Sequence, residues 1–138
     1  MTYSRFTFTL GLALSLSTAL LLTGCSEEDP ITGSPDAVVL TGAVFTITER
    51  VLSGGTQMTA RGTVKNTGKN TWSPIWRIEG DFYTDSTFTF KLGSAVKSYS
   101  FSLAKNEMTA WELKFTSNQF TLSDYPNFAV KNLRVIQN

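Results

Sequence analysis

The chain has 138 residues, 12 lysines and arginines, 11 acidic residues, one cysteine and no histidine. Without histidine it cannot build a Ser-His-Asp or Cys-His catalytic relay or a histidine-ligated metal site. Its net charge of +1 also lacks the basic excess that follows a nucleic-acid backbone. We expect one modest domain, no cofactor and no nucleic-acid partner.

The N-terminal segment has the composition of a secretory signal peptide. Arg5 is the only charged residue before Glu27, and an apolar run follows it from Phe6 to Leu22. This run lies at the lower limit of the ~17 to 25 residues that span a bilayer. A retained transmembrane anchor is the alternative interpretation.

The apolar run ends in Leu22-Thr23-Gly24-Cys25, which resembles the lipobox of bacterial lipoproteins. In that motif an aliphatic residue and two small residues precede the cysteine that becomes the acylated N-terminus. The resemblance implies a signal peptide over residues 1–24 and a membrane lipid anchor on Cys25. An ordinary signal peptide with a stray cysteine remains the other possibility.

Residues 25–36 have the composition of a flexible tether. After Cys25 they are acidic and rich in Pro, Gly and Ser, and Ile31 is their only large apolar residue. Such a segment buries too little surface to order itself, and eleven extended residues reach roughly 36 to 40 Å.

The start of this tether also bears on localisation. Ser26-Glu27-Glu28-Asp29 resembles an acidic signal for export of lipoproteins to the cell surface, although a merely solvating tether fits equally well. Ser26 and Glu27 do not resemble the aspartate that retains lipoproteins in many inner membranes. We expect an outer-membrane protein of the bacterial cell envelope, with its facing side open.

Residues 37–138 form the expected folded domain, with a charge of +4 that offsets the −4 of the tether. Apolar residues alternate with polar ones at the two-residue period of strands. The expected strands span about 39–47, 58–65, 74–83, 88–92, 96–103, 108–116 and 128–136. Glycine-rich or polar turns separate them, and we expect a bulge near Lys131 and Asn132 in the last.

The segment from Ala104 to Phe115 is ambiguous, because its apolar residues fit both helical and strand spacing. We favour a strand over 108–116 because its neighbours are strands. Seven short strands predict an all-β, immunoglobulin-like Greek-key sandwich, with an up-and-down barrel as the alternative.

Three short motifs resemble the bacterial FxLYD-type immunoglobulin-like domains over roughly 44–135. They are Gly62-Thr63-Val64-Lys65-Asn66-Thr67-Gly68, the strand end Asp81-Phe82-Tyr83-Thr84-Asp85, and Leu103-Ala104-Lys105-Asn106-Glu107 before an aromatic strand. In the last, Lys105-Asn106 replaces the Pro-Gly of the family. The resemblance implies a β-sandwich and supplies no catalytic site.

Candidate binding residues are the aromatic side chains Trp72, Tyr83 and Tyr125, which fall at strand ends or on outer faces of the expected strands. Such rings can stack on sugars, but we favour the interpretation that they cap the core and close loops. Glu79 and Asp81 share one strand face, yet a sandwich of this size hardly makes the cleft that paired carboxylates need. No calcium-loop pattern is present.

These observations predict a membrane-anchored envelope lipoprotein whose β-sandwich is a non-catalytic interaction or structural module, not an enzyme. Its partners would be membrane lipid through acylated Cys25 and an unidentified envelope protein or glycan. A carbohydrate-binding module with an exposed aromatic face is the alternative.

Overall fold

A computed structural model describes residues 37–137, which form seven strands and one short 3₁₀ helix. The expected signal peptide, Cys25 and tether lie outside the described residues. The elements are β1 (Val38–Val39), β2 (Ala43–Ser53), β3 (Gln57–Asn66), β4 (Trp76–Tyr83), β5 (Lys91–Tyr99), β6 (Met108–Thr116), η1 (Leu122–Asp124) and β7 (Ala129–Gln137).

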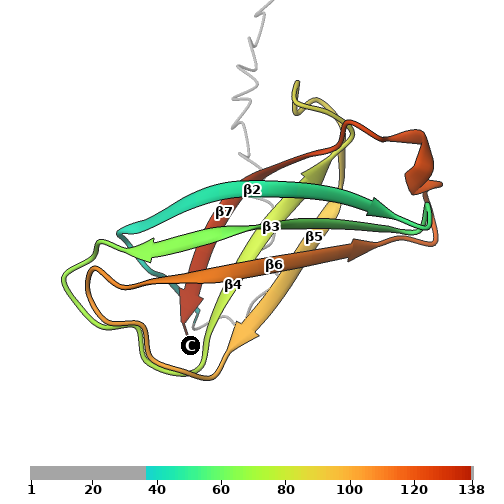
Figure 1. Cartoon of the computed structure of the whole chain (residues 1–138). Coiled ribbons are helices and arrows are strands. Elements are labelled where there is room, and N and C mark those ends of the chain that lie inside the picture. The colour runs from blue at the N-terminus through green and yellow to red at the C-terminus, as the bar shows by residue number, and fades with distance from the viewer. Residues whose placement is uncertain (1–36, 138) are drawn as a thin grey trace, which may run out of the picture. The chain divides into compact units, whose positions relative to one another are not determined.

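The strands form two antiparallel sheets, with orders β1-β7-β4-β5 and β2-β3-β6. The sheets pack face to face and their strands cross at a wide angle (Figure 1). Strands far apart in sequence, β3 with β6 and β4 with β7, are neighbours because the chain changes sheet after β1, β3, β5 and β6. The all-β sandwich with Greek-key crossovers is therefore confirmed, and the up-and-down barrel is wrong.

Three of the expected strands differ from those of the structure. The first expected strand, 39–47, is divided between the two sheets, because Gly42 takes a φ of 84° and lets the chain change direction between β1 and β2. The expected strands 88–92 and 96–103 instead contribute to one strand, β5. Gly93 continues that strand, and the ring of Phe115 occupies the space where its side chain would lie.

The other strand predictions hold within a residue or two. The ambiguous segment is the strand β6, from Met108 to Thr116. The bulge expected in the last strand is present, because two residues of β7, Asn132 and Leu133, lie opposite the single residue Gly80 of β4. Asn132 has a φ of 54°, and a side chain at Gly80 would press on that of Leu133.

The core lies between the sheets and is rich in aromatic rings. Trp76, Ile78 and Phe82 project inward from β4 and are fully buried. The Phe82 ring stacks on Phe115 of β6 and on Phe128, which precedes β7, with centroids 5.4 and 5.9 Å away. These contacts join both sheets, so burial of large rings stabilises a fold whose described part contains no cysteine.

The motif around Asn66 holds the loops at one end of the sandwich. The Asn66 amide is fully buried and donates to the carbonyl oxygens of Asn70 and Leu103, both at 2.9 Å. Thr67 donates twice to the Gly42 carbonyl, from its amide at 2.7 Å and its hydroxyl at 2.8 Å. The asparagine and threonine of this motif thus have structural tasks.

Candidate functional site

Trp72, one of the three expected binding aromatics, is part of the core. Only 3% of the residue is exposed, and its ring packs edge-on against Trp76 at 5.4 Å. Its backbone forms an isolated bridge with Leu103. Trp72 therefore offers no ring face to a ligand, which is what the core-capping interpretation of these aromatics expects.

Tyr83 and Tyr125 belong to the opposite end of the sandwich. Tyr83 ends β4, seven residues from Trp76, which is about 23 Å at ~3.3 Å per residue. Both tyrosines are half-buried; the Tyr83 ring meets Phe88 edge-on at 5.5 Å, and Tyr125 packs against the core after η1. The structure thus separates Trp72 from the two tyrosines, and the three rings make no common row.

Glu79 and Asp81 are buried although they point away from the core. Both lie on the outer face of β4, and only 2% and 5% of each residue is exposed. Arg134 of β7 binds Glu79 through two nitrogens, each 2.9 Å from the same carboxylate oxygen. Lys91 of β5 lies 3.2 Å from Asp81. Each acid therefore has a cation from a neighbouring strand.

The surroundings of Asp81 favour its ionised form. Burial by itself raises the pKa of this carboxyl, but hydrogen bonds from Asn132, Ser94 and Lys91 outweigh it, so the net pKa lies below the ordinary value. The Asn132 amide and Ser94 hydroxyl donate at 2.8 and 2.7 Å. A general acid needs a raised pKa, so Asp81 is arranged as a structural anion that ties β5 and the β7 bulge to β4.

Asp81→Asn is expected to lower the free energy of unfolding at neutral pH by about 1–3 kcal/mol, because it removes the acceptor of several charge-assisted hydrogen bonds. Because the pKa of Asp81 is lowered in the folded state, its stabilisation is present above about pH 4 and is lost as the pH falls through the folded-state value. Urea unfolding at neutral and acidic pH should show the difference from the unchanged protein shrinking in acid. A constant difference, or one shared by the exposed Asp124→Asn, would contradict this role.

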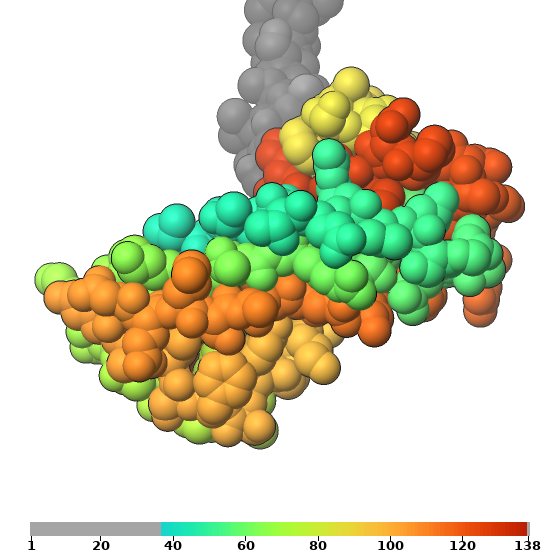
Figure 2. Space-filling view, viewed as in Figure 1, coloured from blue at the N-terminus to red at the C-terminus, as the bar shows by residue number. Residues whose placement is uncertain are grey.

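A shallow hollow adjoins Tyr83 at the far end of the molecule. Its walls come from β2, from the loop 84–90 and from the start of β7, and include Ile47, Arg50, Ser86, Phe88 and Val130. Figure 2 shows these three segments meeting along the upper side of the domain. The Arg50 guanidinium crosses to the segment before β7 and donates to the Phe128 carbonyl at 3.0 Å. The hollow is open and mixed in polarity, and Glu49 is the acid in its lining.

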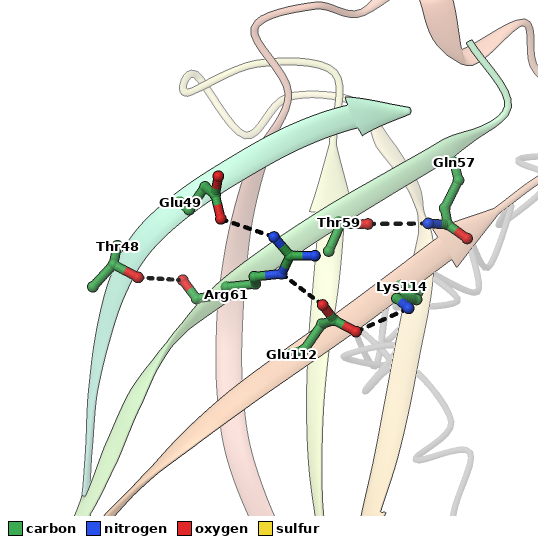
Figure 3. Close-up of polar contacts among 7 residues, drawn as sticks. All are labelled: Thr48, Glu49, Gln57, Thr59, Arg61, Glu112 and Lys114. Atoms are coloured by element: carbon green, nitrogen blue, oxygen red, sulfur yellow. Dashed lines mark hydrogen bonds and ion pairs between the residues drawn. The ribbon is translucent and has the colours of Figure 1, made fainter. Parts of the chain in front are cut away.

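The outer face of the three-stranded sheet carries a row of charges across its strands (Figure 3). Arg61 of β3 binds Glu49 of β2 at 3.0 Å and Glu112 of β6 at 2.6 Å, and Lys114 reaches Glu112 at 3.0 Å. Hydrogen bonds from Arg61 and Lys114 lower the pKa of Glu112. Solvent-exposed pairs of this kind contribute little stability, but they leave this face polar and close to neutral.

The described part of the chain contains neither a cluster of metal ligands nor a membrane-spanning helix. Over residues 37–137, no three His, Cys, Asp or Glu side chains gather as metal ligands. The same residues contain no helix that is long and apolar enough to cross a membrane. Glu79, Asp81 and Glu112 have basic partners instead.

Cys25, the expected lipidation site, lies outside the described residues. No protein-family model, curated protein or solved structure matches this chain. Sequence reasoning missed the side-chain hydrogen bonds of Arg50, Asn132 and Arg134, which connect distant segments of the chain. Their partners become visible only once the strand register is known, because each contact spans 51 to 78 residues of chain.

Proposed function

We propose that this protein is a lipid-anchored lipoprotein of a bacterial cell envelope, in which a small β-sandwich acts as a non-catalytic interaction or structural module. The observation that carries the proposal is the sequence Leu22-Thr23-Gly24-Cys25 at the end of an apolar run. Two or three acyl chains on one cysteine give firm membrane attachment, since each buried CH₂ contributes ~0.8 kcal/mol.

The fold is compatible with a lipid anchor at the N-terminus and a separate, non-catalytic β-sandwich. The first strand begins at Val38, directly after the acidic tether. The buried acids Glu79 and Asp81 are engaged by Arg134 and Lys91 and serve the sheet that carries them. These features support a module that presents a surface and does no chemistry. The outer membrane remains the proposed location, because Ser26 and Glu27 do not resemble an inner-membrane retention signal.

Metabolic labelling with a fatty-acid analogue tests the anchor. The protein should take up the label, and Cys25→Ser should abolish the uptake and release the protein from the membrane fraction, because no other cysteine exists in the chain. Ser26→Cys in the Cys25→Ser background is a matched control, since it returns a thiol one residue away and should not restore labelling. Label that persists in Cys25→Ser would overturn the proposal.

The carbohydrate-binding alternative would need a different set of aromatic residues from the one first considered. Trp72 is buried, which leaves Tyr83 with Phe88 beside the hollow at the far end. The polar groups Arg50, Asp85, Thr87 and Asn127 line an adjoining hollow, and such groups can bind sugar hydroxyls. An envelope glycan therefore remains a second candidate partner, and this end of the domain is where it would bind.

A further inference from the structure

The end of the sandwich where the chain enters the fold can be located from the strand register. Val38 pairs with Gln137, Gln137 pairs with Trp76, and Trp76 pairs with Tyr99. The beginnings of β1 and β4 and the ends of β5 and β7 therefore share one end. Figure 1 shows this end below, where the end of β7 lies beside the start of β4 and the end of β5. We call it the entry end.

Apolar side chains are exposed at the entry end. Val38 and Ile75 are each 61% exposed, and Phe101, which directly follows the last row of β5, is 44% exposed. The Phe101 ring meets Trp76 and Tyr99 edge-on, at 5.6 and 5.7 Å. Firm aromatic packing therefore holds this exposed ring in place. Exposed aliphatic and aromatic side chains of this kind partition into a membrane interface.

Two lysines lie in the loops at the same end of the domain. Lys69 lies with Leu40, Trp72 and Gln137 around a hollow beside the end of β7. Lys105 occupies the turn after Leu103, which is tied to Asn66 through the Asn106 amide. Both lysines are exposed. The acid of this turn, Glu107, accepts a hydrogen bond from the Ala104 amide at 2.8 Å, which fixes its carboxylate against the turn.

The far end has the opposite charge in its loops. The loop 84–90 carries Asp85, and the segment between β6 and β7 carries Asp124; neither loop contains a lysine or arginine. The loops at the two ends thus differ in charge, with lysines at the entry end and acids at the far end, where Lys131 lies over the Phe88 ring and Arg50 lines the hollow. A membrane surface with anionic headgroups attracts the lysine-bearing loops of the entry end.

We propose that the entry end, formed by Val38, Ile75, Phe101, Lys69 and Lys105, rests on the anionic surface of the bilayer that holds the lipid anchor. This inference depends on the proposed function, because it needs acylated Cys25 to bring the domain to the membrane. The far end, with Tyr83 and its hollow, then faces away from the bilayer and is the end presented to a partner.

Because the lipid anchor keeps the domain near the membrane, a weak contact is enough to dock the entry end on the bilayer. A domain held by eleven residues cannot move more than roughly 36 to 40 Å from its lipid, so its effective concentration at the surface is high and little intrinsic affinity is required. Each lysine near an anionic surface contributes about 1 kcal/mol, which corresponds to roughly fivefold in the ratio of docked to undocked molecules.

Fluorescence quenching from within the bilayer tests this orientation. The protein acylated on Cys25 is reconstituted into vesicles of phosphatidylcholine and phosphatidylglycerol that carry a nitroxide-labelled lipid. Because acylation occupies the native thiol, Ile75→Cys supplies the only reactive site for a polarity-sensitive fluorophore. Phe90→Cys is the matched control, since Phe90 is 51% exposed and lies on the loop of the far end. We expect quenching and a blue-shifted emission at position 75 and neither at position 90.

Charge and lipid composition give a second readout. Lys69→Glu with Lys105→Glu, in the Ile75→Cys background, should reduce the docked-to-undocked ratio by more than the roughly fivefold expected for one cation. Phosphatidylcholine alone should have a similar effect. Protein that floats with the vesicles but is quenched equally at both positions, or at neither, would overturn the docking and leave the anchor intact. Protein that fails to float with the vesicles would contradict the anchor itself and with it the docking.

Discussion

Replacing Phe82 by alanine is expected to lower the free energy of unfolding by ~3–5 kcal/mol, the range for a fully buried phenylalanine. The ring is completely shielded from solvent and stacks on both Phe115 and Phe128. Its loss would leave a cavity where the two sheets and the segment before β7 meet. Since small domains have only ~5–15 kcal/mol of stability, the variant should be marginally folded at 37 °C.

Urea unfolding followed by tryptophan fluorescence measures this effect, and Phe90→Ala is the matched control. Phe90 is the same residue type, but it is 51% exposed and meets only the edge of Phe120 among the ring contacts of the described chain. We expect Phe90→Ala to cost less than ~1 kcal/mol. Equal losses for the two variants would show that Phe82 does not have the central position in the core described here.

Gly62→Ala is expected to destabilise the protein by more than the ~1–3 kcal/mol typical of overpacking. Gly62 lies in the middle of β3, opposite Ile47, at the point where the register of β2 shifts. A Cβ atom at this position would overlap the carbonyl oxygen of Thr46. Because the obstacle is backbone, relief requires β2 to move as a strand, which a change of side-chain rotamer cannot achieve.

The matched control is Thr63→Ala, one residue further along the same strand. Its side chain faces outward and is half-buried, so we expect a loss below ~1 kcal/mol, within the span of strand propensities. Differential scanning calorimetry of both variants gives the comparison. A Gly62→Ala protein as stable as Thr63→Ala would mean that β2 and β3 do not approach as closely as the structure has them.

Alternation was the most reliable guide to the fold. Met58, Ala60 and Val64 in β3, and Trp76, Ile78 and Phe82 in β4, are fully buried as their spacing predicts. Alternation did not predict the strand boundaries at two glycines. Gly42 separates β1 from β2, whereas Gly93 continues β5. A glycine permits both a turn and a close approach to a ring, and its neighbours in sequence do not say which of the two the packing requires.

The candidate site was less predictable for a different reason. Trp72 sits among polar loop residues and therefore has the sequence context of a surface ring, but the bridge to Leu103 draws it into the core. Glu79 and Asp81 follow the pattern of an exposed strand face, yet Arg134 and Lys91 from the flanking strands bury them. Both outcomes depend on contacts between distant segments, which no local pattern encodes.

The structure shows what the short sequence motifs do. Asn66 holds two loops through its buried amide, and Asn106 takes a φ of 67° in the turn where the resembling family has glycine. Positive φ at this position is typical of a type II turn, and asparagine tolerates it better than most residues. The motifs of the chain thus hold its loops in place.

Intact mass spectrometry of the protein isolated from membranes of its native host tests the central claim most directly. We expect a mature chain that begins at Cys25 and is heavier than residues 25–138 by the mass of a diacylglyceryl group, with or without a further acyl chain. A chain that retains residues 1–24, begins at any other residue, or has Cys25 unmodified would contradict the lipid anchor and the membrane docking that depends on it.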